Sequence, residues 1–181
     1  MIIGLILILL VVGLDQATKY TAQHFLAASG EKVVFIKGVL EFEYFQNSGA
    51  AWGILEGRTL IFFIITIIAL IGFGYLFTKS NFKRKKVYSI SISLLIAGTF
   101  GNAIDRMLLK YVIDFLHVPF LTPILNAVGL SNFWFNIADL ALTVGIIMLA
   151  IDLIFLESRR SRERDRSVYE RLDNQRNNES E

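Results

Sequence analysis

A chain of 181 residues in which 54% of the side chains are hydrophobic has the composition of a membrane protein of one domain. Its lack of cysteine excludes thiol catalysis, disulfide bonds and thiolate metal sites. His24 and His117 lie far apart in sequence, so we expect no metal site. We also expect no cofactor and no nucleic-acid partner.

Four apolar segments lie at about residues 2–22, 60–78, 87–109 and 137–156. Each is close to the roughly 20 residues that a helix needs to cross a bilayer. A cleavable signal peptide is the alternative for the first segment, but that segment begins without Lys or Arg, so we expect a retained helix. Residues 1–157 are therefore predicted to form one transmembrane domain, followed by a charged tail over residues 158–181.

The basic residues predict the orientation of these helices. Twelve of the 18 Lys and Arg residues lie in the loop over residues 79–86 or in the tail. Basic loops remain on the cytoplasmic side, so we expect both termini in the cytoplasm. The tail is also rich in acidic residues, and we expect it to be solvated and partly helical. Binding of a membrane surface or a partner by the tail is the lesser alternative.

Two longer segments are then left on the extracytoplasmic side. In the first, residues 33–36 are apolar, and residues 40–45 alternate between apolar and acidic, which predicts a strand at the bilayer surface over residues 40–45. The second, at about residues 110–136, contains Pro119 and Pro123 and is expected to be irregular or re-entrant. The residues alone thus predict a mainly α membrane protein with four transmembrane helices and a surface strand on the extracytoplasmic side.

Several polar residues interrupt the apolar segments at a similar depth. Asn102, Asp105 and Arg106 are spaced i, i+3, i+4, on one face of a helix. A rise of about 1.5 Å per residue places Asp15, Asn102, Asp105 and Asp139 in the outer third of the bilayer. Ionisable groups at membrane depth are rare, and their alignment indicates a functional site.

Two of the polar motifs have a structural and a functional interpretation. Asp15 and Lys19 form an i, i+4 pair. In the structural interpretation, Lys19 extends to the interface and Asp15 only pairs with it. In the functional interpretation, Asp15 helps to hold a substrate backbone or the surface loop. Asn47 and Gly49 precede Trp52, and this stretch is either a turn with an interfacial anchor or a substrate contact made by Asn47.

A third motif, Asn136 and Asp139, opens the last apolar segment. Asn136 is a favourable helix N-cap, and Asp139 three residues later completes a capping box. This structural interpretation competes with a role for Asp139 in chemistry. The chemical role gains weight because Asp105 and Asp114 also need partners at the same depth.

Two aspartates are the most plausible hydrolytic apparatus in this chain. Paired carboxylates that share one proton hydrolyse a peptide bond without a nucleophilic side chain or a metal. Asp105 lies beside Arg106, which we expect to keep it ionised and paired, whereas Asp114 lies among apolar residues that favour a shared proton. We therefore predict Asp114 and Asp139 as the catalytic pair, supported by Asn102, Asp105, Arg106 and Asn136.

Five ordered blocks of this sequence resemble the bacterial lipoprotein signal peptidase family, signal peptidase II. They lie at residues 15–19, 45–53, 101–106, 112–115 and 135–139. The resemblance implies a mainly α intramembrane aspartic protease with four transmembrane helices, a small extracytoplasmic β-sheet and a short surface helix over its site, in the bacterial inner membrane and near its extracytoplasmic face. Such enzymes remove the signal peptide of diacylglyceryl-modified prolipoproteins, cutting before the lipidated cysteine.

The resemblance also implies residue roles and partners. Its catalytic aspartates fall on Asp114 and Asp139. Positions that bind substrate or support the site fall on Asp15, Asn47, Asn102, Arg106 and Asn136. To these supporting positions we add Lys19, Gly49 and Asp105 from the same motifs. The expected partners are prolipoproteins, membrane lipid and globomycin-like inhibitors, and the expected state is a monomer. Three features depart from the family pattern: Trp52 in place of Phe, a longer stretch between the two aspartates, and the charged tail.

Two rival functions remain open at this point. A small proton-coupled transporter also uses intramembrane Asp, Asn and Arg, although its site is usually near the midplane and between repeats. A structural subunit uses polar residues as contacts between helices. Here the polar residues cluster towards one surface and no repeat is evident, which favours the protease.

Overall fold

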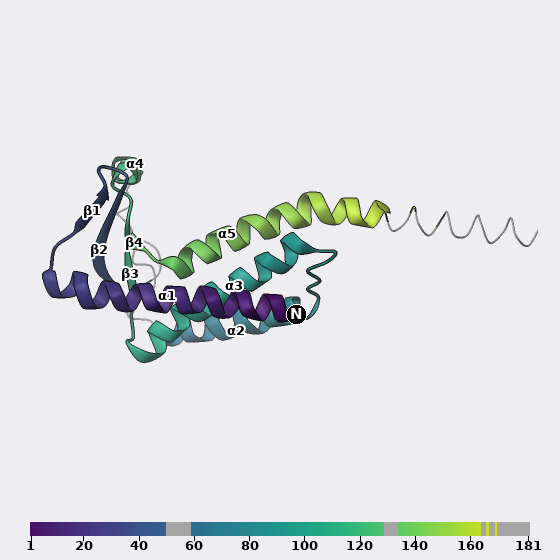
Figure 1. Ribbon diagram of the computed structural model, residues 1–181, viewed down its shortest axis with the longest axis horizontal. Helices are drawn as coiled ribbons and strands as arrows, with labels where there is room; N and C mark the ends of the chain where they lie inside the picture. Colours follow the sequence, from purple (N-terminus) through teal and green to yellow (C-terminus); the bar gives the residue numbers. More distant parts are fainter. Residues whose placement is uncertain (50–58, 129–133, 164–165, 167–168, 170–181) are drawn as a thin grey trace, which may run out of the picture.

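The structure is a computed structural model that describes residues 1–49, 59–128, 134–163, 166 and 169. Four long helices run along the long axis of the molecule, and a small sheet lies across one end of them (Figure 1). The helices are α1 (Ile2–Ser29), α2 (Thr59–Thr78), α3 (Lys86–Leu108) and α5 (Ile137–Ile151). A π-helical segment, η3 (Asp152–Leu156), continues α5 away from the sheet.

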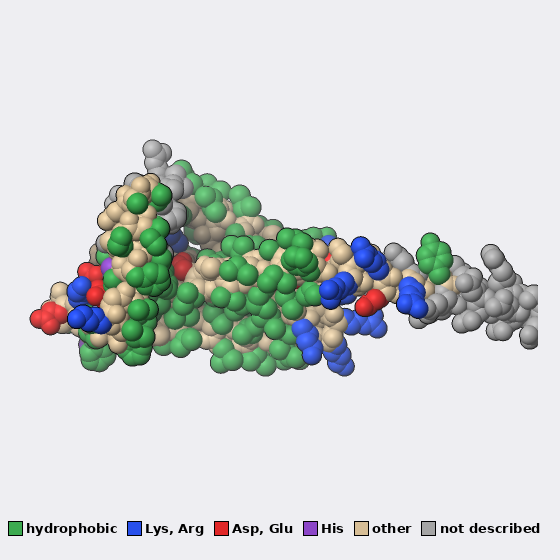
Figure 2. Space-filling model, turned by 90° about the horizontal axis from the view of Figure 1, so that it is seen from above, with side chains coloured by type: hydrophobic (Ala, Val, Ile, Leu, Met, Phe, Trp, Pro, Cys, Tyr) green, Lys and Arg blue, Asp and Glu red, His purple; other side chains and the backbone are tan. Residues whose placement is uncertain are grey.

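All four helices are long and apolar enough to cross a membrane, and they make this a multi-pass membrane protein. Figure 2 shows a broad apolar surface along the bundle, with Lys and Arg side chains gathered at the end away from the sheet. Helix α3 is the central helix, because 61% of its most apolar window is buried against at most 17% in the others. The predicted mainly α architecture, with four transmembrane helices and a small sheet, is confirmed.

Two helices extend beyond their predicted ends. Helix α1 continues past residue 22 to Ser29, where Gly30 adopts a left-handed conformation (φ 64°) and donates its N–H to the carbonyl of Leu26. The last helix continues past residue 156 to Glu163, where Arg160 pairs with Asp152 and Glu157 on preceding turns. A prediction from hydropathy makes these helices too short, because helical hydrogen bonds continue through residues whose side chains are polar. Most of the predicted tail lies outside the described residues.

The sheet has four antiparallel strands in the order β1-β2-β3-β4. The strands are β1 (Val33–Ile36), β2 (Leu40–Asn47), β3 (Val112–His117) and β4 (Trp134–Phe135). The register of β2 against β3 shifts between Phe42 and Phe45. The strand predicted over residues 40–45 is present within β2, and the apolar residues 33–36 form β1.

The second outer segment is more regular than predicted. It contains strand β3, a 3-10 turn η2 (Pro119–Leu121), the short helix α4 (Thr122–Ala127) and strand β4. The expectation of an irregular segment was therefore wrong over these residues. All six residues of β3 are buried, so the strand lacks the alternation that reveals a half-exposed strand. Residues 129–133 of this segment lie outside the described residues.

Close packing joins the sheet and the helices where the polar residues meet. Ala22 of α1 packs with Phe115 and Leu116 of β3 in a buried cluster. Helices α3 and α5 approach closely at Gly98 and Gly101, where an added Cβ would meet atoms of Ala138. These contacts fix α1, α3, α5 and β3 around one point.

Candidate functional site

Asp114 lies in strand β3 and is held by two side-chain amides. Its side chain is 1% exposed. Asn136 Nδ2 donates to Asp114 Oδ1 at 2.7 Å, and Asn47 Nδ2 donates to Asp114 Oδ2 at 2.8 Å. The carboxyl is thus oriented from strand β2 on one side and from the start of α5 on the other.

Asp139 lies in the first turn of α5 and is also held by two donors. Asn102 Nδ2 donates to Asp139 Oδ1 at 2.8 Å, and the backbone N–H of Asn136 donates to Asp139 Oδ2 at 3.2 Å. The backbone N–H of Asp139 donates to Asn136 Oδ1 at 2.9 Å, which completes the predicted capping box. The capping role and a position beside Asp114 therefore occur together, since Asn136 binds both carboxyl groups.

The two aspartates are electrostatically linked. Burial, followed by the charge of Asp139, raises the pKa of Asp114 from the usual 3.8 to about 7. The amides of Asn47 and Asn136 and the charge of Lys19 lower this pKa, but they do not offset burial. Asp114 therefore exchanges its proton near neutral pH.

Lys19 lies at the base of the site with its ammonium group fully paired. Its Nζ is 2.9 Å from Asp15 Oδ2, 3.0 Å from Asp105 Oδ2 and 2.9 Å from Asn102 Oδ1. An ammonium group has three donors, and here each has an acceptor. Lys19 is only 1% exposed, so the interpretation in which it extends to the interface was wrong. Its pairing with Asp15 was predicted.

Asp15 and Asp105 also accept hydrogen bonds from the backbone, Asp15 with its second oxygen and Asp105 with the oxygen that pairs with Lys19. Asp15 Oδ1 accepts the N–H of Ala138 at 2.8 Å, which is an otherwise unpaired donor in the first turn of α5. Asp105 Oδ2 accepts the N–H of Ile113 at 3.0 Å, directly before Asp114. Both acids therefore position the elements that carry Asp114 and Asp139.

Arg106 does not pair with Asp105 as predicted. Neighbouring helical side chains point in different directions, and Asp105 pairs with Lys19 instead. Arg106 donates to the carbonyl of Gly49 at 3.1 Å, and its guanidinium lies 4.4 Å from the centre of the Phe62 ring. It thus holds the turn after β2.

That turn sets the position of Asn47. The N–H of Gly49 donates to Asn47 Oδ1 at 3.0 Å, while Asn47 Nδ2 binds Asp114. The Asn47 side chain therefore holds the turn and contacts Asp114 as well. The predicted turn is present, and Asn47 also binds a residue of the predicted catalytic pair. Trp52 lies outside the described residues.

The chain matches a known protein family over most of its length. A family model described as signal peptidase (SPase) II matches residues 7–155. The chain belongs to the signal peptidase II family. The family predicted from the five sequence blocks is confirmed.

Individual relatives of the signal peptidase II family agree over most of the chain. The lipoprotein signal peptidase of Enterococcus faecalis is 42% identical over 150 residues, which cover 82% of this chain and 85% of the relative. That of Lactiplantibacillus plantarum is 39% identical over 153 residues, covering 84% and 94%. A bacterial membrane enzyme solved by the in meso method at 2.3 Å has a TM-score of 0.68 and 38% identity, covering 83% of this chain and 87% of the other.

Gln16 is a member of the site that the sequence did not indicate. Its Nε2 lies 3.1 Å from Asp15 Oδ2, 3.0 Å from Asp105 Oδ1 and 3.2 Å from the carbonyl of Gly101. It joins α1 to α3 beside the Lys19 ammonium group. An amide directly after Asp15 in an apolar segment is the signal that would have found it.

In this member of the signal peptidase II family, the geometry suits acid–base hydrolysis. Two carboxyl groups on β3 and α5 lie within one amide-bridged network, and one of them titrates near pH 7. Such a pair activates water and protonates a carbonyl without a covalent intermediate. The family supports the protease interpretation rather than the transporter.

Proposed function

We propose that this chain is an intramembrane aspartic endopeptidase that removes the signal peptide of diacylglyceryl-modified prolipoproteins, cutting before the lipidated cysteine. Membership of the signal peptidase II family supports the reaction, and relatives named lipoprotein signal peptidase support the substrate class. The observation that carries the residue assignment is the amide bridge between Asp114 and Asp139, formed by Asn136 and Asn102.

In the proposed mechanism, Asp114 holds the shared proton at rest and Asp139 is the carboxylate. The raised pKa of Asp114 supports this assignment. Asp139 takes a proton from water, whose oxygen attacks the scissile carbonyl carbon, while Asp114 gives its proton to the carbonyl oxygen. The tetrahedral diol then returns a proton to Asp114 as the C–N bond breaks, and Asp139 protonates the leaving nitrogen. Both groups end in their starting states.

The other predicted residues orient this pair. Asn102 and Asn136 hold the two carboxyl groups, and Asn47 fixes Asp114 from the strand side. Arg106 and Gly49 fix the turn that carries Asn47. Asp15, Lys19 and Asp105 anchor the backbone beneath the pair. These are supporting roles, distinct from the acid–base steps.

The same proposal includes a location. Lys and Arg side chains gather at the end of the bundle away from the sheet (Figure 2), which supports a cytoplasmic position for that end and a position of the sheet and the site near the extracytoplasmic face of the bacterial inner membrane. The chain acts there as a monomer with membrane lipid around it, and globomycin-like inhibitors bind at the site. We retain the division into a transmembrane domain over residues 1–157 and a charged tail as part of this proposal.

The test is cleavage of a diacylglyceryl prolipoprotein by the reconstituted protein, with and without globomycin. Asp114→Asn and Asp139→Asn should each lower turnover by about 10³-fold or more, since a general acid or base is lost. Glu31→Gln, an acid on the exposed loop before β1, should retain full turnover. Retained turnover in either Asn variant removes that residue from the pair, and no cleavage by the unaltered protein rejects the proposed activity.

A further inference from the structure

The end of the bundle away from the sheet carries an excess of exposed positive charge. Lys and Arg side chains gather there, whereas acidic and basic side chains are mixed at the sheet end (Figure 2). Five of these cations are exposed, and their side chains make no hydrogen bond or ion pair with any residue that the structure describes: Lys83, Arg84, Lys86, Arg159 and Arg162. We call these five residues the basic surface.

The acids near the basic surface are mostly paired with other residues. Asp152 is buried and pairs with Arg160. Glu157 pairs with Arg160 at 2.9 Å and with Lys85 at 3.3 Å. Among the described residues of this end, Glu163 is the one other acid. The basic surface therefore keeps a net positive charge, which an anionic partner would complement.

The cations between α2 and α3 are presented by an ordered turn. Asn81 Oδ1 accepts the N–H of Lys83 and the N–H of Arg84, each at 3.0 Å. The N–H of Asn81 donates to Ser89 Oγ at 2.8 Å, which joins the turn to α3. The turn is also joined to the end of α5 by the ion pair of Lys85 with Glu157.

Arg159 and Arg162 continue the lipid-facing side of the last helix. Ile151 and Phe155 are 44% and 60% exposed on this helix. Arg159 and Arg162 follow Phe155 at spacings of four and three residues, so the four side chains share one face. Glu157, which contacts Lys85 of the turn, lies on the other face. Lipids that cover Ile151 and Phe155 therefore have their headgroups beside the two arginines.

The depth of these arginines agrees with that position. With a rise of about 1.5 Å per residue, Arg159 and Arg162 are about 33 Å and 38 Å along the helix from Ile137. The hydrocarbon core is about 30 Å thick, and the headgroup layers bring the bilayer to about 40–45 Å. Both guanidinium groups thus lie at the level of the lipid phosphates, which guanidinium groups bind with paired hydrogen bonds.

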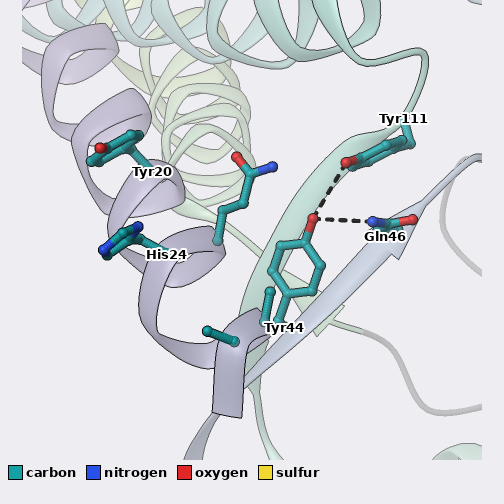
Figure 3. Close-up of a pocket in the computed structure, with 8 residues that line it drawn as sticks. Tyr20, His24, Tyr44, Gln46 and Tyr111 are labelled. Carbon is teal, nitrogen blue, oxygen red and sulfur yellow. Dashed lines mark hydrogen bonds between the residues drawn. The ribbon is translucent and has the colours of Figure 1, made fainter. Parts of the chain in front are cut away.

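The sheet end has no comparable surface where α1 passes the strands. Figure 3 shows Tyr44 between Tyr111 and Gln46, with the rings of Tyr20 and His24 on the other side of α1. Tyr44 Oη lies 3.4 Å from Tyr111 Oη, and Gln46 Nε2 donates to Tyr44 Oη at 3.2 Å. No Lys, Arg, Asp or Glu lines this recess. Such neutral groups suit a membrane interface but do not distinguish lipids by their charge.

A soluble polyanion is a less suitable occupant of the basic surface. The ion pair of Lys85 with Glu157 lies between the turn and the helix, and Arg159 and Arg162 are on the helix face away from it. The two groups of cations therefore point to different sides of the bundle. Several separate lipids can bind such a surface, whereas one compact polyanion cannot contact both sides.

We propose that the basic surface binds the phosphate groups of anionic phospholipids in the leaflet around it. Arg159 and Arg162 bind lipids whose acyl chains cover Ile151 and Phe155, and the cations of the turn bind lipids beside α2 and α3. In the orientation of the proposed function this is the cytoplasmic leaflet. The binding itself does not depend on peptidase activity.

The test is lipid retention by the full chain in native mass spectrometry. The purified protein is mixed with equal amounts of phosphatidylglycerol, phosphatidylserine and phosphatidylcholine of identical acyl chains. We expect both anionic lipids to be retained about tenfold more than phosphatidylcholine, because each nearby Lys or Arg contributes roughly fivefold. This preference should weaken as the ionic strength rises, since salt screens exposed charges. Equal retention of the three lipids overturns the proposal.

Paired variants locate the binding. Arg159→Gln with Arg162→Gln, and Lys83→Gln with Lys86→Gln, should each lower the preference about threefold or more, and all four changes together should abolish it. Lys32→Gln with Lys37→Gln removes the same charge from exposed positions at the sheet end and should keep the preference. An equal loss in this control would show an effect of net charge alone and would overturn the proposal. The melting temperature checks that each variant is folded.

Two further measurements separate this proposal from its alternatives. Asp114→Asn should lose turnover but keep the lipid preference, so failure of the proposed peptidase and failure of lipid binding are distinguishable. Loss of the preference in Asp114→Asn would place the lipids at the catalytic pair and overturn the proposal. Poly-glutamate, added at the concentration of the lipids, should leave the bound lipids in place. Their displacement would identify a soluble polyanion as the occupant instead.

Discussion

Asn102 of α3 and Asn136, the N-cap residue of α5, are joined by one hydrogen bond, from Asn136 Nδ2 to Asn102 Oδ1 at 3.1 Å. Each amide also donates to one aspartate, Asn102 to Asp139 and Asn136 to Asp114. The relative position of the two carboxyl groups is therefore set by a pair of neutral amides. These donors stabilise one negative charge without adding a cation that would hold both aspartates ionised.

Replacing Asn102 should therefore impair turnover more than folding. We expect Asn102→Ala to lower kcat about 10²-fold, because Asp139 loses its amide donor and a displacement of about 1 Å has an effect of that size. The measurement is kcat for a diacylglyceryl prolipoprotein in detergent. Asn126→Ala, which removes an exposed amide from α4, is the matched control. Equal activity of the two variants would show that Asn102 does not position the pair.

The pH profile of kcat/KM should fall on its alkaline side near the pKa of Asp114. That pKa is about 7, and the pair needs one proton, so activity should decrease as pH rises above this value. The amide of Asn47 lowers the pKa of Asp114, so Asn47→Ala should move the alkaline limb to higher pH while reducing the maximum. Profiles from pH 5 to 9 test both statements. A limb that moves to lower pH in Asn47→Ala would contradict the assignment.

Asp114 should also make the protein less stable as pH rises. Its pKa is about 7 in the folded state and 3.8 ordinarily, so between these values the folded state holds a proton that the unfolded state has released. The stability from this group is complete below pH 4 and is lost as pH rises through about 7. On going from pH 4 to pH 8, the melting temperature of Asp114→Asn should therefore rise by about 10 °C relative to that of the unaltered protein. No change in that difference would contradict the raised pKa.

Lys19 should be essential for folding, since its removal leaves Asp15 and Asp105 without a counter-charge. Loss of one partner from a buried ion pair costs about 3–5 kcal/mol, and Lys19 is 1% exposed. Lys19→Met should therefore lower the melting temperature strongly, whereas Lys37→Met, at an exposed turn, should not. Adding Asp105→Asn to Lys19→Met should restore part of the loss. A full loss in the double variant would contradict a charge-based cause.

Hydropathy and charge predicted most of the fold, because four apolar segments and one basic end leave few arrangements. They did not predict strand β3, whose six buried residues have no alternating pattern. Helical rise predicted that Asp15, Asn102 and Asp139 lie at one depth, and the hydrogen bonds between their helices agree. The depth of a charged residue in the bilayer does not, however, tell which other residue it pairs with.

Partners within the site depend on side-chain direction and on helix packing, which sequence spacing does not contain. Asp105 was expected to pair with its neighbour Arg106, but Lys19 on another helix is its partner. Gln16 was missed for the same reason, since its acceptors on α3 are distant in sequence. Tertiary packing thus decided the contacts that local spacing left open.

Helix packing at Gly101 should control both stability and activity. An added Cβ there would lie 2.7 Å from Asp15 Oδ2 and 3.1 Å from the Cβ of Ala138. Asp15 cannot move freely, because it accepts the N–H of Ala138 and pairs with Lys19. Gly101→Ala should therefore move α1 and α5 away from α3, at a cost of about 1–3 kcal/mol.

The same displacement moves Asn102 away from Asp139, so turnover in Gly101→Ala should fall about 10²-fold together with the melting temperature. Gly74→Ala is the matched control, since no atom lies within 4 Å of a Cβ on Gly74 in α2. Alanine is the better helix former, so this control should be neutral or stabilising by up to about 1 kcal/mol. Thermal unfolding and turnover are measured for both variants in one detergent. Normal turnover in Gly101→Ala would show that the two carboxyl groups keep their positions when the helices separate.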